Sequence, residues 1–310
     1  MKRVVLTGAT GFIGRWCVQP LLEKGYEVHL ITSRPESPLP KETLGAQAHC
    51  VDLFDAGSVY RLLSSLRASH LMHFAWIATP GMYWNSTANI SWVAASLEML
   101  RAFQELGGVR TVFAGTCAEY DWGRAEVCNE SETPLATDGA RLPSLYACSK
   151  VGLQKMQAAF GRGTGMSAAW GRIFHQYGPY EHPARLVSSV ILHLLKDRVA
   201  KCTHGRQIRN FMHVKDVGSA FAALLDSSVE GPVNIGSVQR VKLRDILSEI
   251  STQLGRPDLV QLGARAEPPG EPAVLVPDVN RLYVEVGWRP ALTLEHGLAD
   301  AIAWHRGNSA

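Results

Sequence analysis

Short apolar runs alternate with longer segments of helical spacing along the first half of the chain. The apolar runs, which we expect to form strands, cover residues 4–6, 28–31, 48–51, 71–74, 111–114 and 167–170. Helices are expected in a segment ending at Gly25 and at residues 59–66, 88–106 and 146–160. This alternation is typical of βαβ units and predicts a mostly parallel sheet with helices on both faces. Pro20 should remove one backbone hydrogen bond from the first helix and bend it.

The turn between the first strand and the first helix carries three glycines. It reads Thr7-Gly8-Ala9-Thr10-Gly11-Phe12-Ile13-Gly14. Without a Cβ, Gly8 and Gly11 let the backbone turn tightly and approach a pyrophosphate, and Gly14 lets the helix pack closely on the strand. The free N–H groups and positive end of the helix would then face the phosphates. A turn that merely tolerates glycine is the alternative, but the place after a Val-Val-Leu strand favours dinucleotide binding.

The end of the second strand bears on which dinucleotide binds. NAD sites usually carry Asp or Glu there for the ribose hydroxyls, whereas this chain has Thr32-Ser33-Arg34. Arg34 can pair with a 2′-phosphate and Ser33 can donate a hydrogen bond to it, so NADP(H) is preferred over NAD. The alternative is a solvated Arg34 that stacks on the adenine of either dinucleotide.

The pattern changes from about Phe174, where prolines and glycines divide the chain into shorter pieces. Pro179, Pro183, Pro232 and Pro268-Pro269-Gly270 mark these breaks. We expect an α/β, doubly wound Rossmann fold over residues 1–174, to which residues 211–236 return. Residues 175–210 and 237–310 are expected to form a smaller C-terminal substrate-binding lobe.

Composition narrows the function classes. The 310 residues are 46% hydrophobic and 19% charged, with a net charge of +3 and no basic run, which argues against nucleic acid and anionic membranes as partners. The apolar runs are too short to span a bilayer, and Gly8 and Gly11 interrupt the start that mimics a signal peptide. Six scattered cysteines without a C-x-x-C pair argue against a metal site or a disulfide framework, and for the cytoplasm.

A tyrosine and a lysine four residues apart are the first catalytic candidates. Tyr146 and Lys150 would share one face of a helix, and Lys150 would then lower the pKa of the Tyr146 phenol. The alternative is that Tyr146 and Lys150 are only neighbours on the exposed surface of a helix, with no catalytic role. Thr116 follows the fifth predicted strand, at the carboxyl edge of the sheet where ligands bind, and this favours a catalytic group.

With these residues in view, the chain resembles the extended short-chain dehydrogenase/reductase family of nucleotide-sugar epimerases, dehydratases and reductases. The resemblance runs nearly end to end. Its motifs are the glycine loop, Asp52-Leu53, His73-Phe74-Ala75-Trp76, Asn89, Thr116 with Tyr146 and Lys150, residues 172–179, residues 209–217, Asn234-Ile235-Gly236-Ser237 and Val286-Gly287-Trp288-Arg289-Pro290. So many matches in the same order identify the family with high specificity. They say less about which reaction this member catalyses.

The resemblance implies a role for each matching residue. Asp52 and Leu53 would surround the adenine, and Ala75 and Trp76 would border the phosphate and ribose of the cofactor. Lys150 would also hold the nicotinamide ribose. Thr116 would hydrogen-bond the reacting sugar oxygen, and Tyr146 would exchange its proton while hydride moves. Arg209 would contact the nucleotide diphosphate, for which a guanidinium fork is suited; a surface ion pair is the alternative.

Positions at which the chain departs from the family pattern limit the reactions that it could catalyse. Dehydratases of the family have Asp-Glu after the catalytic Thr, and here Cys117-Ala118 follow Thr116, which argues against 4,6-dehydration. Cys117 is either a proton-transfer group or, as we prefer, a small buried hydrophobe. His175 stands where many members have Asn, and is either a substrate donor or acid, or a packed and hydrogen-bonded histidine.

The sequence therefore predicts an NADPH-dependent reductase of the C4 ketone of a nucleotide-activated 4-keto-6-deoxysugar. An NAD-dependent C4 epimerase of a nucleotide sugar is the second hypothesis. A non-catalytic NADP-sensing or scaffold protein is a third, against which the intact Thr116, Tyr146 and Lys150 argue. By resemblance, the helices at 88–106 and 146–160 would pair two subunits in a homodimer.

Overall fold

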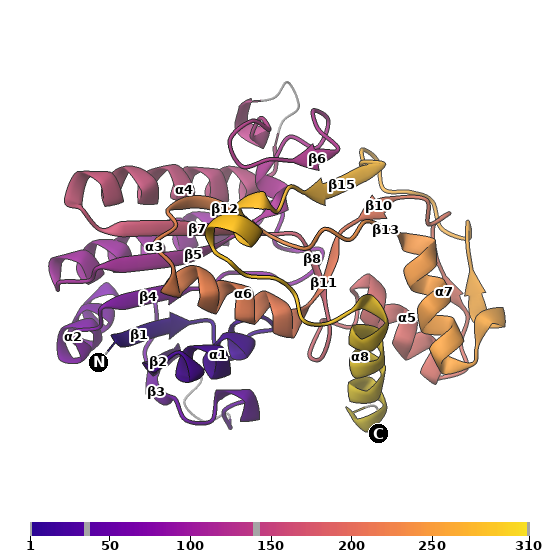
Figure 1. Ribbon diagram of the computed structural model, residues 1–310, viewed down its shortest axis with the longest axis horizontal. Helices are drawn as coiled ribbons and strands as arrows, with labels where there is room; N and C mark the ends of the chain where they lie inside the picture. Colours follow the sequence, from indigo (N-terminus) through magenta and orange to yellow (C-terminus); the bar gives the residue numbers. More distant parts are fainter. Residues whose placement is uncertain (1, 34–37, 139–142, 309–310) are drawn as a thin grey trace.

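The computed structural model describes residues 2–33, 38–138 and 143–308, and its centre is a seven-stranded parallel sheet. The strand order is β12-β7-β5-β4-β1-β2-β3 (Figure 1). These strands are β1 (Lys2–Thr7), β2 (Tyr26–Thr32), β3 (Gln47–Cys50), β4 (His70–His73), β5 (Arg110–Thr116), β7 (Ser167–Ile173) and β12 (Gly231–Ile235). The predicted Rossmann-like α/β fold is confirmed.

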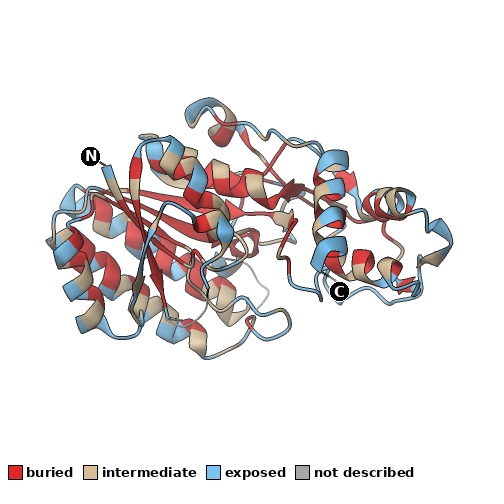
Figure 2. Cartoon of the chain, turned by 90° about the horizontal axis from the view of Figure 1, so that it is seen from below, coloured by how far each residue is buried: buried red, intermediate tan, exposed pale blue. Residues whose placement is uncertain are grey.

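Alternate residues of the strands pack against helices on opposite faces of the sheet. Val4 and Leu6 of β1 lie in one apolar core with α1 (Val18–Glu23) and α6 (Val214–Asp226). Val5 lies in a second core with α2 (Ala56–Leu66), α3 (Ala88–Glu105) and α4 (Leu145–Thr164). Figure 2 shows the strands buried in red between helices whose outer faces are exposed. Burial on both faces explains why the strands read as continuous apolar runs.

The first helix starts differently from the prediction. A 3₁₀ turn, η1 (Gly14–Cys17), comes directly after the glycine loop, and the α-helix begins only at Val18. Pro20 therefore lies in the first turn of α1, where backbone N–H groups have no partner within the helix. Cys17 and Val18 both have helical backbone angles, so the 3₁₀ turn runs directly into α1, and the bend expected at Pro20 stays a prediction.

A smaller unit lies beside the carboxyl edge of the sheet, on the right of Figure 1. Its helices α5 (Leu186–Leu195), α7 (Leu243–Leu254) and α8 (Leu294–Asn308) share a third apolar core. A four-stranded sheet has the order β13-β10-β15-β6, and two pairs, β11-β8 and β14-β9, complete the strands. Their bounds are β6 (Val127–Cys128), β8 (His175–Tyr177), β9 (Ala200–Lys201), β10 (Ile208–Arg209), β11 (Phe211–His213), β13 (Val241–Lys242), β14 (Val260–Gln261) and β15 (Val274–Pro277).

A buried acid in this unit makes stability depend on pH. The Glu181 carboxylate accepts hydrogen bonds from the Ser188 hydroxyl at 2.7 Å and the Ser188 N–H at 3.0 Å, and His305 of α8 contacts the same hydroxyl. Burial raises the pKa of Glu181 to about 7. In the folded protein Glu181 therefore keeps its proton up to about pH 7, whereas in the unfolded chain it loses that proton near its ordinary pKa. The free energy of unfolding consequently falls as the pH rises from that value towards 7.

We expect Glu181→Gln to remove that pH dependence, because glutamine keeps the uncharged form at every pH. By linkage, the variant should gain up to roughly 3 kcal/mol over the wild type at pH 8 and about none at pH 4.5. Urea denaturation at several pH values measures the difference. The exposed Glu132→Gln is the control and should follow the wild type; a Glu181→Gln curve parallel to the wild type would contradict the assignment.

Candidate active site

The glycine loop lies directly against the end of β4. Gly8 has φ +72°, a left-handed conformation that glycine adopts without strain, and a Cβ there would lie 2.7 Å from the Ala75 nitrogen. A Cβ on Gly14 would overlap the Gly8 carbonyl and lie 2.8 Å from the Gly8 carbonyl carbon. The expected close packing of helix on strand is confirmed, because two of the three glycines are in backbone contact that excludes any side chain.

The predicted cofactor residues follow four neighbouring strand ends. Phe12 and Ile13 continue the loop after β1, and exposed Ser33 follows β2. Asp52 and Leu53 follow β3, where the Asp52 carboxylate accepts a hydrogen bond from the Phe54 N–H at 3.0 Å. Ala75 and Trp76 follow β4. Arg34 lies outside the described residues. The parallel register brings the other positions to one edge of the sheet, as a dinucleotide site requires.

Thr116 and Tyr146 meet at this edge from different elements. Thr116 is the last residue of β5, and Tyr146 is the second residue of α4, whose N-terminus is capped by the Ser144 hydroxyl. The Tyr146 N–H donates to the Trp84 carbonyl at 2.9 Å, which fixes where the helix begins. The Thr116 side chain hydrogen-bonds Tyr146. The structure thus joins two of the three predicted catalytic residues.

The pKa of Tyr146 moves in the direction opposite to the prediction. Burial raises it above the ordinary value for a phenol, and the hydrogen bond from Thr116 offsets this only in part. The expectation of a lowered pKa is therefore wrong. The phenolate is poorly solvated at this site, so the protonated form is favoured.

Lys150 is buried one turn further along α4, with 4% of its surface exposed. Its Nζ donates to the Ala114 carbonyl at 2.9 Å and lies 3.7 Å from the centre of the Trp76 ring. Burial lowers the pKa of Lys150 to about 7, and the negative charge of Glu119 acts against this. Its ammonium group is consequently close to its titration midpoint at neutral pH.

Glu119 is a site residue that the sequence reasoning missed. It ends η3 (Cys117–Glu119), and its fully buried carboxylate accepts hydrogen bonds from the Thr116 N–H at 2.8 Å and from Arg172 Nε at 2.7 Å. The Thr116 hydroxyl oxygen in turn accepts from the Ala118 N–H. This is a capping box, and the T-x-x-E spacing was a visible signal for it.

Two further aromatic residues border Tyr146. The rings of Tyr83 and Trp84 lie 4.8 and 5.9 Å from that of Tyr146, both nearly perpendicular to it. Trp122 packs edge-on against Trp84 and donates from its indole nitrogen to the Cys117 carbonyl at 2.8 Å. Residues 77–87 carry neither helical nor strand periodicity, so no pattern in the sequence placed them here.

Cys117 and His175 are both uncharged at neutral pH. Burial raises the pKa of the Cys117 thiol to about 12, and the residue packs with Tyr120, Cys128 and Leu275 in a small apolar cluster. Burial, together with the charges of Arg209 and Arg185, lowers the pKa of His175 to about 3. Its Nδ1 is buried without a hydrogen-bond partner among the described residues. The lowered pKa opposes a role for His175 as an imidazolium acid, and no hydrogen bond at Nδ1 supports the packed alternative. Its role as a substrate donor stays a prediction.

Arg209 is neither exposed nor unpaired. It lies on β10 with 2% of its surface exposed and forms an ion pair with Glu271. It also donates to the Ile208 carbonyl at 2.9 Å and the Pro272 carbonyl at 2.7 Å. The ion pair considered as the alternative is present, but only its Glu271 end is exposed, because Arg209 itself is buried. A diphosphate at this position would share the guanidinium with Glu271.

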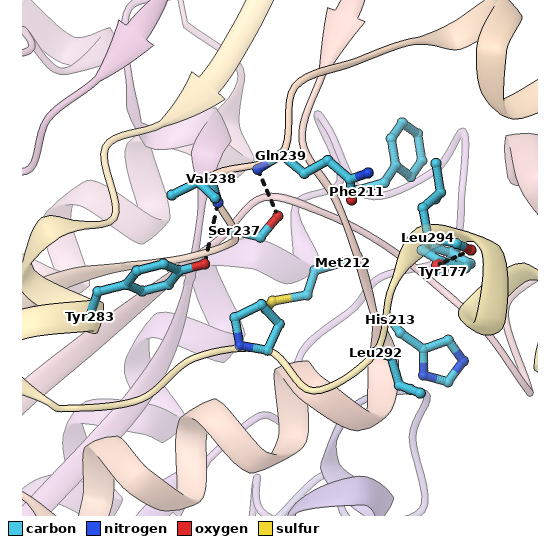
Figure 3. Close-up of a pocket in the computed structure, with 11 residues that line it drawn as sticks. Tyr177, Phe211, Met212, His213, Ser237, Val238, Gln239, Tyr283, Leu292 and Leu294 are labelled. Carbon is cyan, nitrogen blue, oxygen red and sulfur yellow. Dashed lines mark hydrogen bonds between the residues drawn. The ribbon is translucent and has the colours of Figure 1, made fainter.

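A different hollow, a cavity of about 180 Å³, is lined in part by residues of β11 (Figure 3). Met212 and Leu292 line it, and the Tyr283 hydroxyl accepts a hydrogen bond from the Val238 N–H at its rim. Thr116, Tyr146 and Lys150 are not among its lining residues. This cavity is consequently separate from the candidate catalytic residues.

Comparison with known proteins places the chain in a family. The model of the NAD dependent epimerase/dehydratase family matches residues 4–236. The chain belongs to this family. A UDP-glucuronic acid decarboxylase 1 from Xenopus tropicalis is 27% identical over 98% of this chain and 72% of its own length. The resemblance inferred from the motifs is confirmed.

Solved structures of family members share the fold over almost the whole chain. The UDP-glucose 4-epimerase of Thermus thermophilus, in complex with NAD, is 27% identical with a TM-score of 0.77, over 98% of this chain and 99% of that one. The dTDP-glucose 4,6-dehydratase from Streptomyces venezuelae, with NAD bound, is 25% identical with a TM-score of 0.83, over 99% and 97%. The Thermotoga maritima UDP-glucose 4-epimerase, at 21% identity and a TM-score of 0.86 over 99% and 100%, shows the fold alone.

We expect Gly14→Ala to damage dinucleotide binding in this member of the family. The added Cβ meets backbone atoms, which cannot move aside, so the loop must shift at a cost of roughly 1–3 kcal/mol. Urea denaturation and titration with NADPH measure stability and affinity. Gly152→Ala on the exposed face of α4, where a Cβ has open space, is the control and should be neutral or stabilising. Wild-type affinity in Gly14→Ala would exclude the loop as the phosphate cradle.

Proposed function

We propose that the protein reduces the C4 ketone of a nucleotide-activated 4-keto-6-deoxysugar with NADPH. The observation that carries the proposal is that Thr116 and Tyr146 meet at the carboxyl edge of the sheet, while Cys117 and Ala118 after Thr116 offer no acid and base for removing water. A phenol that is protonated at neutral pH is suited to donate a proton to the alkoxide that forms when a ketone is reduced. Oxidation of a sugar hydroxyl requires the opposite, a deprotonated tyrosine that accepts the proton.

The residues after Thr116 support reduction rather than dehydration. Removal of water needs an acid and a base, and the adjacent positions hold the protonated thiol of Cys117 and the methyl group of Ala118. The next carboxylate, Glu119, is fully buried and is engaged by Arg172, Trp170 and the Thr116 backbone. Proton transfer near the substrate is therefore assigned to Tyr146, with Thr116 beside it.

The bound nicotinamide would supply the hydride, and the chain's own residues would orient the ketone and move the proton. The Thr116 hydroxyl would hydrogen-bond the carbonyl oxygen, and Tyr146 would protonate that oxygen. Lys150 would hold the nicotinamide ribose and, when charged, stabilise the tyrosinate left behind. Relatives named for UDP-glucuronic acid, UDP-glucose and dTDP-glucose support a nucleotide sugar as the substrate.

We propose NADPH because Thr32-Ser33-Arg34, at the end of β2, carries no acid. Thr32 is buried at the end of that strand and exposed Ser33 follows it, so neither offers a carboxylate to the ribose hydroxyls of NAD. Arg34 is proposed to pair with the 2′-phosphate. A homodimer in the cytoplasm is also proposed, for which exposed Ile90 on α3 and Met156 on α4 offer apolar contacts. No helix among the described residues is long and apolar enough to cross a membrane.

An NAD-dependent C4 epimerase of a nucleotide sugar is the second candidate. The likeness to the Thermus thermophilus UDP-glucose 4-epimerase bound to NAD favours it. An epimerase returns the hydride to the same sugar and retains its dinucleotide, whereas a reductase releases oxidised cofactor after each turnover. Release and analysis of the dinucleotide in the purified protein distinguish them. Retained NAD, with isomerisation that needs no added cofactor, would refute the reductase.

We expect NADPH to bind more tightly than NADH, and Ser33→Asp to reverse the order. The new carboxylate would accept hydrogen bonds from the ribose hydroxyls of NADH and repel the 2′-phosphate of NADPH. The affinity for NADPH should therefore fall by about tenfold or more. Quenching of protein fluorescence by each dinucleotide gives the affinities. Ser33→Asn, which adds similar bulk without the charge, is the control. A wild type that prefers NADH would contradict the assignment.

We expect Tyr146→Phe to lower kcat by roughly 10²-fold or more, the usual loss when a positioned acid is removed. The assay follows NADPH oxidation with 4-keto-6-deoxysugars carrying the nucleotide that most stabilises the protein against heat, among UDP, GDP, CDP and dTDP. The half-exposed Tyr60→Phe on α2 is the control and should keep wild-type activity. Unchanged turnover in Tyr146→Phe would refute the proposed mechanism.

A further inference from the structure

We propose that Glu119 is a positioning residue of this site, which holds the backbone of Thr116 in place and supplies the buried negative charge that Lys150 requires. The inference rests on the proposed function in one respect, the assignment of Thr116, Tyr146 and Lys150 to the reaction. Glu119 itself contacts neither β4 nor the glycine loop in any hydrogen bond that we find among the described residues. It acts through its neighbours.

The contacts of Glu119 fix the direction of the Thr116 hydroxyl. The Thr116 N–H donates to Glu119 Oε1 at 2.8 Å, and the Thr116 hydroxyl oxygen accepts from the Ala118 N–H at 3.2 Å. That leaves the hydroxyl hydrogen directed away from the backbone, towards Tyr146 in the free protein and available to the sugar oxygen when substrate is bound. A hydroxyl that donates to a phenol oxygen stabilises the phenolate, which matches the effect of Thr116 in lowering the pKa of Tyr146.

The surroundings of Glu119 are built to hold a carboxylate. Its side chain is fully buried and also accepts from the Trp170 indole N–H at 2.8 Å and from Arg172 Nε at 2.7 Å. A Cβ at Gly115 would collide with the Trp170 nitrogen and Glu119 Oε1, so glycine leaves the space the carboxylate occupies. A buried charge without such partners would be strongly unfavourable.

An ion pair of this kind contributes little stability by itself, since apolar residues of similar volume often replace buried pairs without loss. The local geometry offers a functional reason for keeping it. The Trp170 ring, whose N–H binds Glu119, also lies 5.8 Å from the Lys150 Nζ. Glu119 thus binds the N–H edge of the same indole above which the Lys150 ammonium group lies.

The groups that face Lys150 leave Glu119 as the anion beside it. From β4, His73 is neutral, because burial and then the charge of Lys150 lower its pKa to about 3. From α4 itself, Tyr146 is protonated, because burial raises its pKa. From η3, Glu119 raises the pKa of Lys150 against the effect of burial. Without that charge, Lys150 would lose its proton at a lower pH.

The charge of Glu119 is tested by the double variant Glu119→Gln/Arg172→Met. The glutamine oxygen can still accept a hydrogen bond from the Thr116 N–H. Methionine in place of Arg172 removes the guanidinium N–H groups, which would otherwise face the N–H groups of the new glutamine amide. NMR of lysine side chains labelled with ¹⁵N or ¹³C follows the titration of Lys150, assigned with Lys150→Arg. We expect the midpoint to fall by about one pH unit. Glu130→Gln is the control, because Glu130 is also buried and accepts the Asn234 N–H at 2.8 Å in the same neighbourhood.

A wild-type Lys150 midpoint in the double variant would overturn the electrostatic half of the proposal. This measurement needs no substrate, so it fails or succeeds independently of the proposed reaction, which Tyr146→Phe tests. The positioning half is tested by Glu119→Asp, which keeps the charge but is too short to reach Thr116 and Arg172 together. We expect kcat to fall about tenfold or more, with the Lys150 midpoint and the KM for NADPH unchanged. Wild-type kcat in this folded variant would overturn the positioning half.

Discussion

The buried ion pair between Glu119 and Arg172 ties together the strand ends on which the site is built. Arg172 lies on β7 and Glu119 in the turn after β5, and the Arg172 guanidinium also donates to the Tyr120 hydroxyl at 3.0 Å. That hydroxyl donates to Asn234 of β12 at 2.7 Å, and Asn234 donates to the Cys128 carbonyl of β6. One network thus crosses from the large sheet to the small one. Loss of either charged partner would leave the other buried and unpaired, at a typical cost of about 3–5 kcal/mol.

Charge at this edge is unevenly distributed. Arg172 and Arg209 have carboxylate partners in Glu119 and Glu271, whereas Lys150 contacts a carbonyl and an aromatic ring. The histidines nearby contribute no charge, because burial keeps His73 and His175 neutral, each with a pKa of about 3. Both guanidinium charges are offset by carboxylates, whereas the Lys150 ammonium group has no carboxylate in hydrogen-bond contact among the described residues.

The sequence predicted the framework well because its signals are local. Apolar runs locate strands buried on both faces, and the glycine spacing locates the turn that packs against Ala75, just after β4. The direction of the Tyr146 pKa was predicted wrongly, because helical spacing places Lys150 on the same face but says nothing of desolvation or of the carbonyl that binds its Nζ. Tyr83 and Trp84 reach the site through a loop without periodicity. Glu119 was the avoidable omission, since its capping spacing from Thr116 was readable.

Burial accounts both for the wrong prediction and for the direction of the proposed chemistry. A tyrosine activated by a nearby ammonium group would act equally well as base or acid, and would not distinguish an epimerase from a reductase. At this site the same desolvation acts on both partners: it stabilises the protonated Tyr146 and weakens the charge on Lys150. The free protein is therefore prepared to give a proton. Oxidation of a sugar hydroxyl would first require Tyr146 to lose its proton, and burial of the phenol opposes this loss in the free protein.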